Sequence, residues 1–140
     1  MNAYKHTQRG KLILIVMGIM SSVCIVFGAA VSRPIFAAVP FFIVAGWLFH
    51  SLTIEIADGE LWWRFGPGLI HKHVPLNEIA SARSVRTNVL EGWGIHLSRF
   101  GWLYNVSGFD AVAIKLKNGK SFCLGTDEPQ ALLAVLGLRV

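Results

Sequence analysis

The sequence contains little charge and little cysteine for its 140 residues. Only 15% of the residues are charged, and the two cysteines, Cys24 and Cys123, lie about a hundred positions apart. This separation predicts no structural disulfide, and no pair of Cys or His residues has the spacing of a zinc knuckle or ribbon. The sequence therefore argues against a small domain that is stabilised by disulfides or by zinc.

Motifs that carry catalysis are missing as well. The chain has no Gly-x-Ser-x-Gly elbow and no glycine-rich phosphate loop before a helix. The carboxylates of its C-terminal part are scattered over turns and strand ends, without the spacing of a paired general acid and base. Those considered are Glu55, Glu78, Glu91, Asp110 and Asp127. We therefore expect a protein that is not an enzyme and that uses no cofactor and no metal.

The net charge of +5 is concentrated at the N-terminal end. Positions 1–52 hold four bases and no acid, whereas positions 53–140 hold nine bases and eight acids. Nucleic-acid binding depends largely on neutralising phosphates, and a C-terminal part with a charge of +1 has little capacity for that. The sequence therefore predicts no nucleic-acid partner, and its mean hydropathy of +0.53 favours a chain that lies partly in lipid.

Two apolar runs predict a membrane-spanning helical hairpin. Residues 12–31 are 20 positions without a charge, and at 1.5 Å per residue they form a helix of about 30 Å, the thickness of a bilayer core. After a break at residues 32–34, residues 35–52 form a second apolar helix, which we expect Pro40 to bend. A cleaved signal peptide is the alternative for the first run, but the apolar region of a signal peptide is usually only about 7–15 residues long.

The charges that flank the two runs predict their orientation. Segment 1–11 carries three bases, whereas the turn 32–34 carries only Arg33. Because Lys and Arg are retained in the cytoplasm, we expect segment 1–11 to be cytoplasmic and the turn to be periplasmic. Residues 53–140 then form a cytoplasmic domain, so that both termini lie inside the cell.

Beyond Leu52 the sequence takes on the two-residue period of β-strands. Thr53-Ile54-Glu55-Ile56 alternates polar and apolar residues, and Asp58-Gly59 is typical of a hairpin turn. The clearest hairpin joins residues 111–116 to residues 121–124 through Asn118-Gly119. We expect about seven strands in meander order, with Arg83 and Arg86 facing solvent.

One helix ends the chain. Thr126 is placed to cap it, Pro129 falls in the first turn where a missing N–H costs nothing, and Gly137 is a typical terminator. The predicted fold class is thus a membrane α-helical hairpin followed by an α+β domain. That domain is a bent antiparallel sheet or partly open barrel, with the helix closing its open end.

Several glycine- and tryptophan-containing motifs of this domain are distinctive. They are Asp58-Gly59-Glu60, Phe65-Gly66-Pro67-Gly68, Gly92-Trp93-Gly94-Ile95, Gly101-Trp102-Leu103-Tyr104-Asn105-Val106-Ser107-Gly108 and Gly125-Thr126-Asp127-Glu128-Pro129. On these motifs the chain resembles a bacterial family of small membrane proteins in which two transmembrane helices precede one pleckstrin-homology-like (PH-like) domain. The resemblance covers most of the chain, and the stretch from Gly101 to Gly108 is its most specific part.

The resemblance implies a binding scaffold more than a catalyst. Eukaryotic relatives of the fold grip phosphoinositides with bases around the first hairpin. Here that hairpin carries Asp58 and Glu60, and Arg64 is its only nearby base. The sequence therefore argues against inositide binding by this route.

An aromatic stretch with interleaved bases is the candidate contact surface. Its residues are Trp93, Arg99, Phe100, Trp102 and Tyr104. Such a stretch can contact a partner protein or lie in the headgroup layer of the inner leaflet. The alternative is that these rings fill the core of a small domain, which needs every large side chain it has.

Two histidines raise the question of a metal site. His71 and His73 alternate on a predicted strand, so their side chains share one face, and His96 is a candidate third ligand. No Cys or carboxylate is placed with them by the sequence. We therefore favour two solvent-facing polar residues on an edge strand.

These observations together predict a multi-pass protein of the bacterial inner membrane. Its expected partners are the lipid bilayer and a membrane or cytoplasmic protein or its own copies. The expected role is a noncatalytic anchor or scaffold at the membrane. The alternative is a membrane-tethered sensor of lipid or of a small ligand held in a pocket between sheet and helix.

Overall fold

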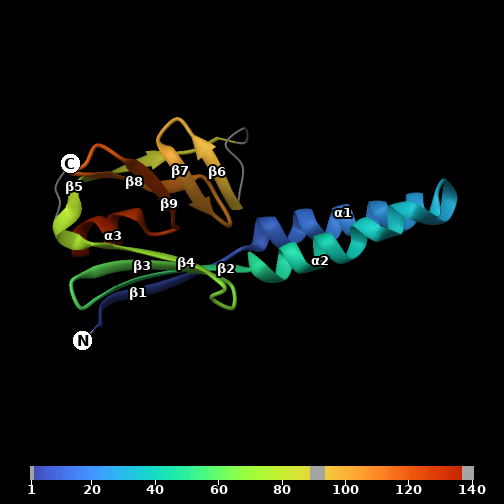
Figure 1. Ribbon diagram of the computed structural model, residues 1–140, viewed down its shortest axis with the longest axis horizontal. Coiled ribbons are helices and arrows are strands. Elements are labelled where there is room, and N and C mark those ends of the chain that lie inside the picture. Colours follow the sequence, from blue (N-terminus) through green and yellow to red (C-terminus); the bar gives the residue numbers. More distant parts are fainter. Residues whose placement is uncertain (1, 89–93, 137–140) are drawn as a thin grey trace.

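Two β-sheets, a C-terminal helix and a protruding helical hairpin make up the computed structural model, which describes residues 2–88 and 94–136 (Figure 1). The helices are α1 (Lys11–Ala30), α2 (Ala38–Leu48) and α3 (Pro129–Leu136), with 3-10 turns η1 (Arg33–Ala37) and η2 (Leu76–Glu78). The strands are β1 (Asn2–Arg9), β2 (Ser51–Ala57), β3 (Glu60–Phe65), β4 (Ile70–Pro75), β5 (Ile79–Arg86), β6 (Gly94–Ser98), β7 (Gly101–Asn105), β8 (Asp110–Leu116) and β9 (Ser121–Gly125).

The first sheet is antiparallel in the order β1-β2-β3-β4. Its β2–β3 hairpin turns at Asp58 and Gly59, which both have positive φ angles, as the Asp-Gly pair predicts. The predicted alternation is confirmed for the apolar side chains of β2 and β3, which are buried in the core at every second position, while Ser51 and Thr53 of β2 are buried as well. The buried apolar side chains include Ile54, Ile56, Leu61, Trp63 and Phe65.

The second sheet departs from the predicted meander. Its order is β5-β8-β9-β7-β6, and β7 runs parallel to β9 while the other neighbours are antiparallel. The β8–β9 hairpin is confirmed, with Lys115 opposite Ser121. The prediction of about seven strands in one bent sheet was too low, since the described residues hold nine strands in two sheets.

The core lies between the two sheets and is closed by α3 at the end opposite the helical hairpin (Figure 1). The hydroxyl Oγ1 of Thr126 accepts a hydrogen bond from the Glu128 backbone N–H at 3.2 Å, and α3 then begins at Pro129, as predicted. Gly137, the predicted terminator, lies outside the described residues. Leu132 and Leu133 of α3 are buried in the core.

The N-terminal segment belongs to the domain, contrary to the expectation for residues 1–11. Residues 2–9 form β1, which pairs antiparallel with β2 along its whole length. The inward positions of β1 are the polar or amphipathic residues Tyr4, His6 and Gln8. The segment therefore has no apolar period to mark it as a strand, and its partner lies some 45 positions later in the sequence.

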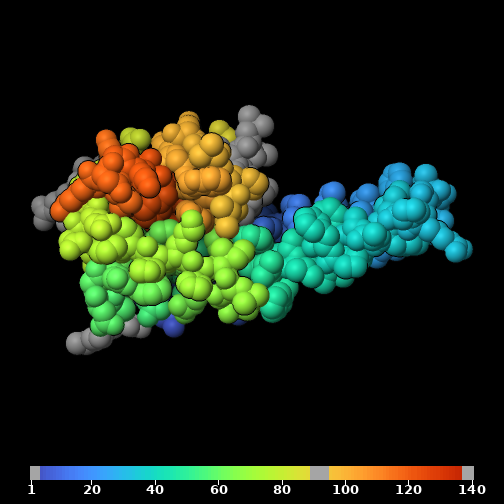
Figure 2. Space-filling model, in the orientation of Figure 1, coloured from blue at the N-terminus to red at the C-terminus, as the bar shows by residue number. Residues whose placement is uncertain are grey.

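The two apolar helices lie side by side and project from the domain as a narrow arm (Figures 1 and 2). A Cβ at Gly46 of α2 would lie in ordinary contact with Met17 and Leu14 of α1. The second run was predicted as one helix over 35–52, but it divides into η1 and α2, and the chain enters β2 at Ser51. Pro40 is the third residue of α2, so it falls in the first turn and not in the helix interior.

Candidate functional site

The predicted aromatic surface is divided between the core and the outside. Tyr104 is only 4% exposed, and its ring centroid lies 5.4 Å from that of Trp63 in the core. Trp102 is 51% exposed, and Trp93 lies outside the described residues. The alternative that these rings fill the core therefore holds for Tyr104, whereas Trp102 remains available for contact.

Arg99 and Phe100 form the turn between β6 and β7, which lies close against the start of β9. Gly101 has a φ of +96°, and a Cβ there would lie 2.2 Å from the Ser121 carbonyl oxygen. Ser98 supports the turn, because its Oγ donates to the Gly101 carbonyl at 2.8 Å and accepts from the Phe100 N–H at 3.1 Å. The glycine is thus required both by its backbone angle and by the close approach of the strands.

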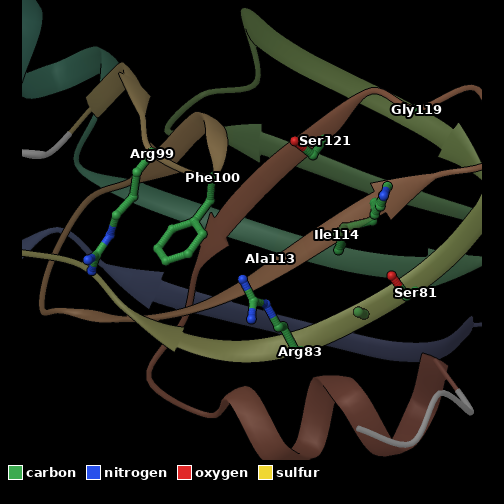
Figure 3. A pocket seen from close by; sticks show the side chains of 10 residues that line it. Ser81, Arg83, Arg99, Phe100, Ala113, Ile114, Gly119 and Ser121 are labelled. Carbon is green, nitrogen blue, oxygen red and sulfur yellow. The ribbon is translucent and has the colours of Figure 1, made fainter.

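The outward face of β5, β8 and β9 forms the floor of a groove beside this turn (Figure 3). The strand registers place side chains in rows across the sheet: Ser81, Lys115 and Ser121 form one row, and Arg83 lies opposite Ala113 in the next. Because the side chain of Ala113 is small, the groove is deepest at the centre of its floor. The groove has a volume of about 540 Å³.

Three bases and one aromatic ring give the groove its chemistry. The guanidinium carbons Cζ of Arg83 and Arg99 lie 5.6 and 4.8 Å from the centre of the Phe100 ring, and Arg99 also donates to the Arg86 carbonyl at 2.9 Å. Lys115 is the third base. Among the described residues that line the groove, no side chain is acidic. The groove is therefore positively charged, with an apolar wall.

A second polar cluster joins β1 to the start of α3. The Tyr4 hydroxyl donates to the Glu128 carboxylate, and a ring nitrogen of His6 lies 2.5 Å from the Asp127 carboxylate. Burial, together with the hydrogen bond to Glu128, raises the pKa of Tyr4 above its ordinary value. The cluster connects the two ends of the domain across more than 120 positions of sequence, and we assign it a structural role.

The histidines that raised the question of a metal site are separately engaged. His71 hydrogen-bonds through Nδ1 to the Gly68 carbonyl at 3.0 Å. His73 stacks on Trp62 with ring centroids 4.2 Å apart and lies 3.4 Å from the Glu60 carboxylate. Within residues 2–88 and 94–136, no group of three His, Cys, Asp or Glu side chains is placed to hold a metal ion.

The base that the sequence places near the β2–β3 hairpin is engaged within the sheet. Arg64 makes an ion pair with Glu55 at 3.2 Å, and β1 brings Lys5 opposite Glu55 as well. This pair lies across β2 and β3, where the register sets Arg64 opposite Thr53 and Glu55 opposite Trp62.

Sequence reasoning found two residues of the groove and missed the rest. Arg99 and Phe100 belong to the predicted contact stretch, and Arg83 was predicted only to face solvent. One signal in the sequence could have indicated a hollow on this face. The outward positions of the strand are Ala111, Ala113 and Lys115, so two of the three carry alanine where a solvent-facing strand usually carries a large polar residue. Their meeting with Arg83 depends on the pairing of β5 with β8, which no local pattern reveals. The chain matches no protein-family model, no curated protein and no solved structure.

Proposed function

We propose that this chain is an integral inner-membrane protein in which the α1–α2 hairpin anchors a PH-like domain at the cytoplasmic face as a noncatalytic scaffold. One observation carries the proposal: the paired strands β1 and β2 run directly into the paired helices. The Gly10 N–H donates to the His50 carbonyl at 2.7 Å, one residue beyond the Arg9–Ser51 pair on each strand. The two sheets with their C-terminal helix are compatible with the predicted α+β class of the domain.

The surface of the helical arm supports a location in lipid. By length and composition helix α1 can cross a membrane, and only 17% of its apolar window is buried, whereas the core helix of a soluble domain is mostly buried. Large apolar side chains cover the outside of both helices. They include Leu14, Ile15, Val16, Ile19, Val23, Ile25, Val26, Phe27, Phe41, Ile43, Val44 and Trp47.

The second helix is shorter than a full membrane span. The apolar segment Arg33–Leu48 falls below the length of a typical spanning helix, with 5 residues in η1 and 11 in α2. A short span is accommodated by local thinning of the bilayer, at a cost of fractions of a kcal/mol per ångström. Helix α2 is therefore proposed to cross the membrane beside α1, and Arg33 to reach the headgroups on the far side.

The charges fit a cytoplasmic domain. Lys11 begins α1 at the domain end of the arm, whereas Arg33 lies at its tip, and the four bases of positions 1–52 include three at the domain end. The retention of Lys and Arg in the cytoplasm then places the domain and both termini inside. Anionic lipids of the inner leaflet add attraction for these bases.

The domain is held close to the base of the arm. Gly66, in the turn between β3 and β4, donates its N–H to the Ser51 carbonyl at 2.9 Å, and a Cβ at Gly66 would lie 2.6 Å from the Leu48 carbonyl oxygen. This contact leaves little freedom for the domain to tilt about the hairpin. Leu69 in the same turn is exposed and apolar, so we propose that it contacts the headgroup layer.

The scaffold role rests on an apolar pair at the edge of the second sheet. Leu97 of β6 is 72% exposed and lies directly opposite Trp102 of β7. Exposed Trp is enriched in protein contacts, and β6 is an edge strand of its sheet. We propose that this pair contacts a membrane or cytoplasmic protein or a second copy of the chain.

Labelling of single cysteines in intact cells tests the topology. Both native cysteines are buried, so the unmodified chain is the blank. We expect an impermeant maleimide to label Arg33→Cys from outside and to label Lys120→Cys only after permeabilisation. Labelling of Lys120→Cys from outside, or release of the protein by alkaline carbonate, would refute the proposed anchoring.

Retention of a partner in mild detergent tests the scaffold role. We expect a chain carrying Leu97→Ser and Trp102→Ser to lose a protein, or the second copy, that both the unmodified chain and a Lys120→Ser control retain. Equal retention by all three chains would place the contact elsewhere. A monomeric unmodified chain that retains no protein would contradict the scaffold role, and the small-ligand alternative, which the basic groove favours, would replace it.

A further inference from the structure

We propose that the groove on the outer face of the second sheet binds a small organic anion, with its phosphate or carboxylate group on Arg83 and Arg99 and its apolar part against Phe100 and Ala113. The inference rests on the proposal that the domain is a binding module. It does not require that the helices cross a membrane. It concerns a face of the molecule that neither the helical arm nor α3 covers (Figure 3).

Two like charges converge on one ring at the end of this groove. Arg83 from β5 and Arg99 from the β6–β7 turn both approach Phe100, with Cζ atoms 5.6 and 4.8 Å from its centre. In Figure 3 the Phe100 ring lies between the two guanidinium groups, and each group can make a charge-assisted interaction with an anion beside the ring. The planar guanidinium group is suited to a bidentate contact with phosphate or carboxylate.

The positive charge is local to the groove. Residues 53–140 have a net charge of only +1, yet three of their nine bases line this one hollow. Two other bases of the domain are paired with carboxylates outside the groove, Arg64 with Glu55 and Arg86 with Asp110. Clustered bases attract an anionic ligand to the groove.

The size of the groove favours an organic anion over a bare inorganic ion. Its volume of about 540 Å³ lies within the usual range of small-molecule sites, roughly 300–1,000 Å³. The floor and wall combine the methyl group of Ala113 and the Phe100 ring with the hydroxyls of Ser81 and Ser121. This mixture of apolar and polar groups fits a ligand with one charged end and one apolar or planar part.

A lipid headgroup and a free metabolite share this chemistry. Both present a phosphate or carboxylate, and the groove does not distinguish them by charge. The experiment therefore uses phenyl phosphate as a soluble probe and varies the lipid around the protein. The full chain is placed in nanodiscs of phosphatidylcholine alone or of phosphatidylcholine with phosphatidylglycerol.

Calorimetric titration of the full chain with phenyl phosphate tests the site. In phosphatidylcholine nanodiscs we expect saturable binding that Arg83→Gln weakens at least about tenfold, the value of a charge-assisted hydrogen bond. Ala113→Leu fills the floor and should abolish the binding with an unchanged circular dichroism spectrum. The matched control is Arg86→Gln, on the same strand but outside the groove, which should leave the affinity unchanged.

The comparison between the two nanodisc compositions identifies the source of the anion. If the occupant is a headgroup, phosphatidylglycerol should lower the apparent affinity for phenyl phosphate in the unmodified chain but not for Arg83→Gln. If it is a free anion, the lipid should have no effect. Absence of binding by the unmodified chain, or equal weakening by Arg83→Gln and Arg86→Gln, would overturn the proposal. Carbonate extraction of the same variants reports on anchoring separately, so the two proposals fail independently.

Discussion

Replacing Gly10 with Ala tests the junction between the sheet and the helical arm. Gly10 lies between β1 and α1, and its φ of −80° is open to any residue, so the backbone itself is not strained by the change. An added Cβ would lie 2.7 Å from the Ile13 Cγ2, 2.7 Å from the Phe49 carbonyl oxygen and 3.1 Å from the Val106 Cβ. The whole effect is therefore steric.

The loss of stability caused by Gly10→Ala depends on which of the neighbouring atoms can move away from the added Cβ. The Ile13 methyl can rotate away, but the Phe49 carbonyl belongs to the backbone next to His50, which accepts the Gly10 N–H at 2.7 Å. Val106 is fully buried. Relief of the clash must stretch this hydrogen bond or displace the core, and overpacking of this kind costs about 1–3 kcal/mol. We expect a loss in the upper half of that range.

Denaturant unfolding of the full chain in mild detergent measures this loss, with Gly18→Ala as the matched control. No atom lies within 4 Å of a Cβ added at Gly18, and Ala favours a helix interior over Gly by roughly 0.5–1 kcal/mol. The same chemical change should therefore lower the unfolding midpoint at Gly10 and leave it unchanged or raise it at Gly18. Equal midpoints for the two variants would refute the tight junction between sheet and arm.

Three further predictions concern the domain itself. Tyr104→Ala should lower the free energy of unfolding by about 3–5 kcal/mol because it leaves a cavity in the core. Trp102→Ala should lower it by less than about 1 kcal/mol because Trp102 is exposed, and chemical denaturation measures both values. Gly101→Ala should lower the thermal midpoint in differential scanning calorimetry, because the positive φ and the Ser121 carbonyl both oppose a side chain; an unchanged midpoint would contradict this. The raised pKa of Tyr4 keeps it neutral in the folded state after the unfolded chain begins to ionise near pH 10, so the unfolding free energy should fall above that pH. Tyr4→Phe should fall less steeply over the same alkaline range in parallel urea titrations, and equal slopes would show that Tyr4 is not shielded.

Much of the secondary structure follows from local pattern. The uncharged run from Leu12 predicts α1, and the alternation in β2 and β8 predicts strands whose inward faces are buried as expected. Asp58-Gly59 and Asn118-Gly119 mark their turns because such pairs accept positive φ angles readily; both residues of the first pair have a positive φ, and Gly119 alone has one in the second. These signals act over a few residues, which is why the sequence alone carries them.

Local patterns could not predict which distant strands pair with each other. The polar inward residues of β1 give no period, and the strand exists because β2 returns beside it after the helical hairpin. The parallel pairing of β7 with β9 likewise joins segments separated by β8. Neither partnership is encoded in a local repeat, because each depends on a chain reversal made elsewhere.

The candidate site shows the same division. The sequence by itself determined the apolar arm, the charge imbalance around it, most strands and the C-terminal helix, since each depends on the period or composition of one continuous segment. Only the tertiary structure decided that Tyr104 is buried while Trp102 is exposed, and that Arg83, Arg99 and Lys115 line one groove. The physical reason is that the groove is built across strand registers, and a register is set by how whole sheets pack.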